Sequence, residues 1–136
     1  IMALTYAAKR GIDVSIIMPH IPDKIYAFAV AKTYYNELLE AGVKIYEYEP
    51  GFVHAKVFVA DDAKAVVGTI NLDYRSLFHH FECGAFLYEN SQIAAIERDF
   101  QDTLKKCMKM QAADYKKQKL YMRVIGKVLR MFAPLM

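Results

Sequence analysis

The chain has 136 residues, of which 55% are hydrophobic, and this length and composition predict one sizeable core and argue against disorder. It contains no run of about 18 uncharged apolar residues, which excludes a complete transmembrane helix within it, and no signal-peptide pattern. The two cysteines, Cys83 and Cys107, are too few for a disulfide framework and lack zinc-site spacing. We expect two free thiols, with a disulfide as the less favoured alternative. Because the chain opens on Ile within a helical pattern, we expect it to be part of a longer chain.

The net charge of +3 is unremarkable, but its distribution is uneven. Residues 105–136 contain nine Lys/Arg and one Asp, a balance of +8. Residues 1–104 contain nine Lys/Arg and fourteen Asp/Glu, a balance of −5. A basic tail on an acidic body predicts that the tail faces an anionic surface such as lipid or nucleic acid.

Hydrophobic spacing in the first half of the chain predicts a strand–helix–strand unit with parallel strands. The predicted elements are the end of a helix (1–10) stopped by Gly11, a buried strand (12–18) ended by Pro19, a helix capped by Asp23 that runs to about residue 41 before Gly42, and an alternating strand (43–49).

The second half predicts further strands and two helices. In chain order these are strands at 52–60 and 63–69 around the turn Asp61-Asp62, a short irregular or helical piece (71–78), a strand (81–89), a helix capped by Asn90 or Ser91 that runs to about residue 110, and a last helix over about 114–132. The apolar face of the helix that starts near residue 90 contains Ile93, Ile96, Phe100, Leu104 and Met108. The pattern predicts a mixed β-sheet flanked by α-helices, in the α/β class (α+β in some schemes).

Two cationic side chains are predicted to share one face of the strand at 52–60. His54 and Lys56 are two residues apart, so both point to the same side. A lone histidine on a strand is usually structural, but a buried ammonium beside it needs a partner. A bound anion such as a phosphate would satisfy both.

Donor groups follow at the end of the next strand. Gly68 permits close backbone approach, while the Thr69 hydroxyl and the Asn71 amide suit phosphate oxygens. Glu82, which opens the following strand, is a candidate to accept a hydrogen bond from His54 and to fix its tautomer.

Together these residues form the pattern H-x-K-x4-D-x6-G-[ST]-x-N, which resembles the HKD motif of the phospholipase D superfamily. The chain has His54-Ala-Lys56, then Asp61, then Gly68-Thr69-Ile-Asn71, so every fixed position matches. The segments YEPGFVHAK, VGTINLDYRS and FHHFECGAFLY resemble the second HKD region of bacterial cardiolipin synthases. The resemblance covers nearly the whole chain but only the C-terminal half of such an enzyme, because the first HKD motif is absent.

The resemblance implies a phospholipase D-like fold and a site built from two facing HKD motifs. One histidine attacks phosphorus to form a phosphohistidine, while the other acts as general acid and base, and His54 would take one of these roles. Lys56 and Asn71 would hold the phosphoryl oxygens with help from Thr69, and Glu82 would orient the histidine. Asp61 and Gly68 are expected to be structural, and neither a metal nor another cofactor is implied.

The resemblance also implies an organisation and a set of partners. Residues 1–112 would be the catalytic half-domain and residues 113–136 a basic amphipathic helix. The partners would be phosphatidylglycerol, an anionic membrane surface, and either an N-terminal HKD half or a second copy of the chain. The location would be the bacterial cell membrane, peripherally or through transmembrane segments outside this chain.

For several residues near the motif a structural role is either favoured or left open as an alternative to a role in the site. For His79 and His80 a loop role is favoured over the mouth of the site, and for His20 a loop role and a head-group role stay equal. Asp73 and Arg75 are expected to pair and hold the loop after Asn71. Cys83 is expected to pack on the other face from Glu82.

The last helix separates into an apolar side and a basic side. The apolar side contains Leu120, Val124, Val128, Leu129 and Phe132, and the basic side contains Lys119, Arg123, Lys127 and Arg130. This pattern is typical of an interfacial helix at an anionic membrane, although an ordinary helix packed on the body has a similar pattern. The charge excess favours the membrane.

Three functions are compatible with the sequence. The first is phosphatidyl transfer by a cardiolipin synthase, which forms cardiolipin and glycerol from two phosphatidylglycerol molecules. The second is a homodimeric phosphodiesterase or endonuclease with one HKD motif per chain, although the basic tail lacks the interleaved aromatics of nucleic-acid binders, so nucleic acid is disfavoured. The third is a folded but silent half-domain. One histidine cannot be nucleophile and leaving-group acid at once, so the chain alone should be inactive unless it dimerises.

Overall fold

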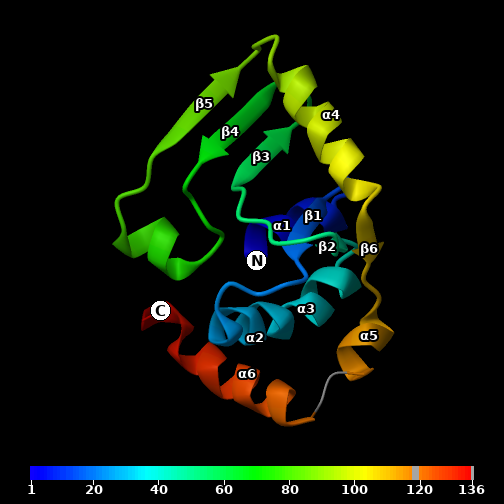
Figure 1. The fold of residues 1–136 in the computed structure, drawn as a ribbon, viewed down its shortest axis with the longest axis vertical. Coiled ribbons are helices and arrows are strands. Elements are labelled where there is room, and N and C mark those ends of the chain that lie inside the picture. Colours follow the sequence, from blue (N-terminus) through cyan, green and yellow to red (C-terminus); the bar gives the residue numbers. More distant parts are fainter. Residues whose placement is uncertain (118–119, 136) are drawn as a thin grey trace. The chain divides into compact units, whose positions relative to one another are not determined.

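The computed structural model describes residues 1–117 and 120–135, which divide into two compact units. Unit 1 consists of Ile1–Val53 and Lys106–Ala133, and unit 2 consists of His54–Lys105 and the C-terminal residues from Pro134. Unit 2 is therefore inserted, in sequence, between the two parts of unit 1. Figure 1 shows the elements of both.

Unit 1 is a three-stranded sheet with helices. Its elements are α1 (Met2–Lys9), β1 (Ser15–Pro19), α2 (Ile25–Thr33), α3 (Tyr35–Glu40), β2 (Lys44–Tyr48), β6 (Cys107–Lys109), α5 (Ala112–Lys117) and α6 (Leu120–Phe132). The 3₁₀ turn η2 (Ala133–Leu135) follows α6 in the chain. The strand order is β1-β2-β6. β1 pairs with β2 in parallel, Ile16 opposite Ile45, and β6 pairs with β2 antiparallel. The predicted parallel strand–helix–strand unit is confirmed.

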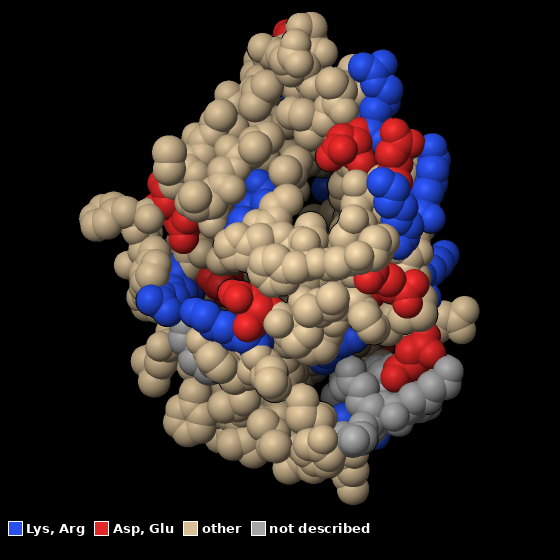
Figure 2. All heavy atoms as spheres, viewed as in Figure 1, with Lys and Arg blue, Asp and Glu red and all other residues tan. Residues whose placement is uncertain are grey.

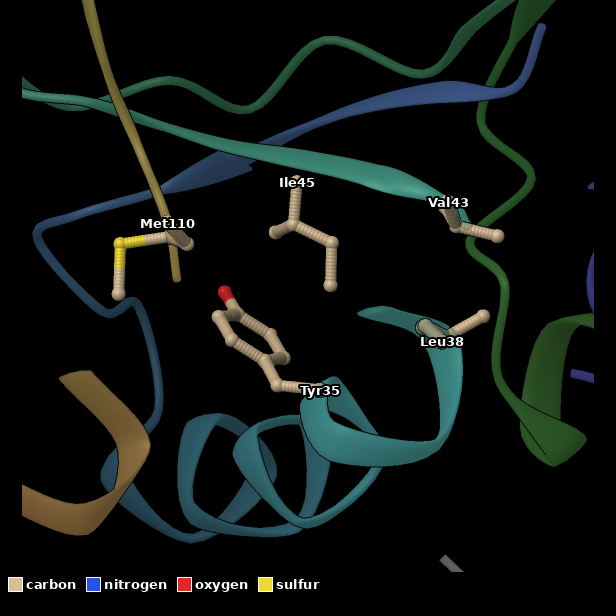
Figure 3. Close-up of a cluster of buried hydrophobic side chains, with 5 residues drawn as sticks. All are labelled: Tyr35, Leu38, Val43, Ile45 and Met110. Carbon is tan, nitrogen blue, oxygen red and sulfur yellow. The ribbon is translucent and has the colours of Figure 1, made fainter. Parts of the chain in front are cut away.

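The core of unit 1 lies between β2 and α3. Val43 and Ile45 point from the β2 side toward Tyr35 and Leu38 of α3, and Met110 closes the cluster from the segment after β6 (Figure 3). Val43 and Ile45 alternate with exposed or half-buried neighbours, as expected for a strand with one buried face. The same alternation brings Glu47 to the buried face.

Two predictions in unit 1 are wrong at helix boundaries. Asp23 is not the cap of α2, because the N-cap residue is Lys24 and no side chain caps that end. The helix predicted to run to about residue 41 is interrupted at Tyr34, which separates α2 from α3.

The helix predicted to run to about residue 110 ends earlier, as α4 (Ile93–Leu104). Its expected last turns instead form β6, and the Met110 N–H donates to the Ile45 carbonyl at 2.8 Å. This pairing provides hydrogen-bond partners for backbone N–H and C=O groups of β2, which would be unpaired if the segment were helical. Met108, expected on the apolar helix face, is 40% exposed on β6.

Unit 2 is an antiparallel sheet with one long helix. It contains β3 (Val57–Ala60), β4 (Lys64–Gly68), the π-helical turn η1 (Arg75–His79), β5 (Gly84–Tyr88) and α4. The strand order β3-β4-β5 is that of a meander, and α4 contacts β3 and β4 (Figure 1). The predicted hairpin around Asp61-Asp62 is confirmed by the pairing of β3 with β4.

The start of α4 differs in detail from the prediction. The N-cap residue is Gln92, and Asn90 acts one step earlier, where its Oδ1 accepts the Gln92 N–H at 2.9 Å. The side chain of Asn90 thus forms the turn that leads into the helix.

The fold class is the predicted one. Both sheets are flanked by helices, and the sheet of unit 1 is mixed. The helix predicted over about 114–132 corresponds to α5 and α6, while residues 118 and 119, including the basic Lys119, lie outside the described residues. The predicted domain boundary after residue 112 stays a prediction.

Candidate active site

The candidate site lies entirely within unit 2, where three strands have one end in common. It is a pocket of about 170 Å³ lined by His54, Lys56, Gly68, Thr69 and Asn71. Pockets that enclose a drug-sized ligand measure roughly 300–1,000 Å³. The volume therefore suits a phosphate-sized group rather than a whole large substrate.

His54 and Lys56 lie in the segment just before β3 rather than within the strand that the sequence predicts at 52–60. The pairing with β4 nevertheless continues by one step, because the Gly68 N–H donates to the Lys56 carbonyl at 3.1 Å. Both side chains line the pocket, as the two-residue spacing predicts. The Lys56 ammonium donates to the His54 carbonyl at 2.7 Å and has three donors in total, so it can also bind an anion.

Thr69 joins the end of β4 to the start of β5. Its N–H donates to the Cys83 carbonyl at 2.9 Å, and its hydroxyl oxygen accepts the Cys83 N–H at 3.1 Å. The hydroxyl proton of Thr69 is donated to Glu82 Oε2. These bonds place Thr69 at the pocket wall, and its predicted contact with phosphate stays a prediction.

Glu82 is held as a carboxylate by hydrogen bonds. Those from Thr69 and, second, from Ser76 lower the pKa of Glu82, and the nearby positive charge of Lys56 acts in the same direction. Glu82 is thus connected to Thr69 by a hydrogen bond. That Glu82 orients His54 stays a prediction.

Gly68 is required by its neighbour across the sheet, Gly84. A Cβ on Gly68 would lie 2.6 Å from the Gly84 Cα and would also meet the Cys83 carbonyl oxygen. Gly68 therefore lets the backbones of β4 and β5 approach at the floor of the pocket.

Asp61, the acidic residue of the motif, lies at the opposite end of β3 from Lys56. Asp61 and Asp62 both have positive φ, and the Ala63 N–H closes the turn on the Ala60 carbonyl at 3.2 Å. At about 3.3 Å per residue, five residues of extended chain separate Asp61 from Lys56 by roughly 17 Å. This position suits a turn residue, the structural role that the sequence predicts for it.

The loop after Asn71 is held by contacts other than the expected pair of Asp73 with Arg75. Asp73 Oδ1 accepts the Ser76 N–H at 2.7 Å, the bond of a helix cap, and Arg75 Nε donates to His80 Nε2 at 2.6 Å. That prediction is wrong because a carboxylate at a helix start is closer to free backbone N–H groups than to a side chain two residues away. His79 Nε2 contacts the Pro134 carbonyl at 2.9 Å.

Exposed apolar side chains occur in the segment between Asn71 and Glu82. Leu72, which follows Asn71 in the sequence, is 58% exposed, and Phe81, which precedes Glu82, is fully exposed. Leu77 and Phe78 of η1 are also exposed. We call Leu72, Leu77, Phe78 and Phe81 the exposed apolar residues of segment 72–81.

Within residues 1–117 and 120–135 there is no group of three or more His, Cys, Asp or Glu side chains arranged to bind a metal. Over the same ranges, no helix is long and apolar enough to span a membrane. Cys83 and Cys107 are both free thiols, as predicted.

Comparison with known proteins assigns the family. Residues 1–104 match the family described as "Cardiolipin synthase, PLD-like domain". The chain belongs to this family. A cardiolipin synthase 2 of Bacillus cereus is 42% identical over 134 residues, which cover 98% of this chain and 26% of that protein. An uncharacterized protein of Streptococcus mutans is 57% identical over 134 residues, which cover 98% of this chain and 29% of that protein.

Within this PLD-like family, the chain therefore spans between a quarter and a third of the length of these two relatives. Among solved structures, Nuc, a phospholipase D family member from Salmonella typhimurium, has a TM-score of 0.70 at 19% identity, covering 82% of this chain and 72% of Nuc. At that identity the likeness concerns the fold, and it confirms the predicted phospholipase D-like architecture.

Proposed function

We propose that the chain supplies one half of the active site of a cardiolipin synthase, with the second HKD motif. The enzyme would transfer a phosphatidyl group from one phosphatidylglycerol to another and form cardiolipin and glycerol. The pocket lined by His54, Lys56, Thr69 and Asn71 carries this proposal. Residues 1–112 would contribute the half-site.

The chemistry requires two histidines. In the first step a histidine nitrogen attacks phosphorus, a P–N bond forms, and the P–O bond to glycerol breaks. The leaving alkoxide takes a proton from the second histidine, which then removes the proton of the incoming alcohol as that oxygen attacks phosphohistidine. His54 performs one of these roles. The HKD pattern occurs once in the chain, so the second histidine comes from an N-terminal half or from a second copy.

Lys56 and Asn71 stabilise the charge on the phosphoryl oxygens. The ammonium and the amide both donate hydrogen bonds, and they line the same pocket wall as His54. Donors fixed before the reaction stabilise developing charge without reorganisation. The proposed steps use no metal or other cofactor.

The exposed apolar residues of segment 72–81 support a lipid substrate over a nucleic acid. A phospholipid presents a phosphodiester beside apolar groups, which fits a small pocket lined by His54 and Lys56 in a unit that also exposes Leu72 and Phe81. Nucleic acid binding relies on an extended row of Lys and Arg along the phosphate backbone. We therefore propose phosphatidylglycerol at a bacterial membrane surface as the substrate.

The test is cardiolipin formation from phosphatidylglycerol vesicles by the chain together with its proposed N-terminal half. We expect His54→Ala to lower the rate by at least about a hundredfold, as for loss of a general acid–base group. Lys56→Ala should also inactivate. Lys64→Ala is the matched control, because Lys64 is exposed at the opposite end of β4 from Gly68, and it should leave the rate unchanged.

Two outcomes would contradict the proposal. One is an unchanged rate of cardiolipin formation in the His54→Ala variant. The other is hydrolysis of a soluble phosphodiester or of DNA without any product from phosphatidylglycerol. Trapping of labelled phosphate on His54 would identify it as the nucleophile, and its absence in an active enzyme as the acid–base.

A further inference from the structure

Helix α6 exposes its most apolar side. Leu120, Tyr121, Val124, Ile125, Val128, Met131 and Phe132 have exposed fractions between 46% and 77%. At 100° per residue these positions fall on one continuous side of the helix, which we call the α6 stripe. Of the five apolar residues that the sequence assigns to one side of this helix, only Leu129 is half-buried, and the other four belong to the stripe. A helix packed on the body through its apolar side would show the reverse.

The opposite side of α6 is fixed against α2 by contacts that prevent rotation. Gly126 is buried, and a Cβ there would lie 2.6 Å from the Ala29 carbonyl oxygen. One turn further on, the Arg130 guanidinium lies 3.9 Å from the centre of the Tyr34 ring and 3.3 Å from Glu37 Oε2. Because small and polar groups make the packing face, the stripe is held outward within unit 1.

The charge around the stripe has one sign. The sequence of α6 contains Arg123, Lys127 and Arg130 and no Asp or Glu, and Lys127 is exposed. Residues 105–136 as a whole contain nine Lys/Arg against one Asp. In Figure 2 the surface over α6, at the bottom of the view, is mostly free of Lys, Arg, Asp and Glu side chains.

We propose that the α6 stripe docks unit 1 onto an anionic lipid bilayer, with α6 lying in the plane of the interface. A large exposed apolar patch marks a protein or membrane contact, and basic residues beside such a patch favour anionic lipid. The positive charge draws the helix to the surface, and the aliphatic side chains enter the boundary between head groups and acyl chains. This docking is independent of the chemistry at His54, although it would bring a lipid-transferring enzyme to its substrate.

The first experiment measures binding by vesicle flotation. Vesicles of phosphatidylcholine with phosphatidylglycerol are compared with vesicles of phosphatidylcholine alone. We expect the protein to float with the anionic vesicles, and we expect Val124→Asp/Val128→Asp to lower the partition coefficient at least tenfold. Met2→Asp/Tyr6→Asp is the matched control, because these α1 side chains are also exposed and the change in charge is the same.

The second experiment reports insertion directly. The chain contains no Trp, so Val128→Trp introduces a single fluorophore in the stripe. With anionic vesicles its emission should move to shorter wavelength and be quenched by lipids brominated on the acyl chains. Tyr6→Trp on α1 should show neither change.

Defined outcomes separate this proposal from its alternatives. Equal flotation of the Val124→Asp/Val128→Asp variant and of the unaltered protein would overturn it. So would a loss of self-association in that variant, measured by sedimentation, with vesicle binding unchanged, because the stripe would then contact a second copy. His54→Ala should bind vesicles normally, so failure of the catalytic proposal and failure of the docking proposal give different results.

Discussion

Thr69 contributes both a wall of the pocket and the main hydrogen bond to a carboxylate beside it. Its hydroxyl donates to Glu82, and this bond is the largest cause of the lowered pKa of that carboxyl group. A carboxylate that stays charged keeps a negative group near Lys56. The interactions of the Glu82 carboxylate contribute to the free energy of unfolding in full at pH values above the ordinary glutamate pKa. This contribution is lost as the pH falls through the lowered pKa of Glu82.

Substitution of Thr69 tests this arrangement. Thr69→Val keeps the shape of the side chain and removes the donor, so the pKa of Glu82 should rise toward its ordinary value. Ser76→Ala should cause a smaller rise, because Ser76 is the second cause. The measurement is an NMR titration of the Glu82 carboxyl carbon. An unchanged midpoint in Thr69→Val would show that the hydroxyl does not control this group.

At the scale of elements, the sheet of unit 2 depends on two glycines that face each other in β4 and β5. Gly68→Ala would place a methyl group against the Gly84 backbone, so the strands must separate. Such overpacking costs about 1–3 kcal/mol, and we expect that loss in the free energy of unfolding together with reduced activity.

Gly84→Ala is the control for the substitution at Gly68. A Cβ on Gly84 would meet its nearest atoms at 3.5 Å, an ordinary contact distance, so stability should change little. Urea unfolding followed by circular dichroism compares the two variants. Equal destabilisation by both would contradict the view that close backbone approach at Gly68 forms the floor of the pocket.

At the scale of the whole molecule, one buried carboxylate connects β2, α2, α3 and the segment after β1 in unit 1. Glu47 of β2 is 1% exposed and forms an ion pair with Lys32 of α2. It also accepts hydrogen bonds from Tyr35 of α3 at 3.0 Å and from His20, just after β1, at 2.9 Å. Burial, and then the charge of Glu47, raise the pKa of Tyr35, so its phenol remains a donor.

Loss of this carboxylate should weaken the whole unit. Glu47→Ala leaves the Lys32 ammonium buried without its partner, and breaking such a pair costs about 3–5 kcal/mol. The double variant Lys32→Met/Glu47→Leu should recover most of that stability, because apolar replacements of both partners avoid the buried charge. Denaturant midpoints measure both effects.

An exposed pair serves as the comparison. Asp13→Ala removes the bond from Lys44 at 2.7 Å, where both side chains reach solvent, so we expect a much smaller shift of the denaturant midpoint than for Glu47→Ala. If Glu47→Ala were as mild as Asp13→Ala, the buried cluster would not be what holds unit 1 together.

Much of this molecule follows from local sequence. Alternation over residues 43–49 and the Asp61-Asp62 turn lead to the observed strands, and the spacing of His54, Lys56, Gly68, Thr69 and Asn71 is enough to bring these residues to one pocket. Strand periodicity and turn chemistry act over a few residues, so they can be read without knowledge of distant contacts. The sequence pattern also predicts that Glu47 points inward, because Glu47 continues the alternation of Val43 and Ile45.

The tertiary structure decided what depends on distant partners. α4 ends at Leu104 because the chain after it pairs with β2, where Lys109 lies opposite Tyr46 and Met108 opposite Glu47, more than sixty positions earlier in the sequence. Thr69 and Glu82 meet through the pairing of β4 with β5, and Asp73 accepts the Ser76 N–H instead of pairing with Arg75. The side of α6 that faces outward is set by the fit of Gly126 against Ala29. A hydrophobic pattern shows that a helix has an apolar side. Whether this apolar side is buried depends on how the opposite side of the helix packs.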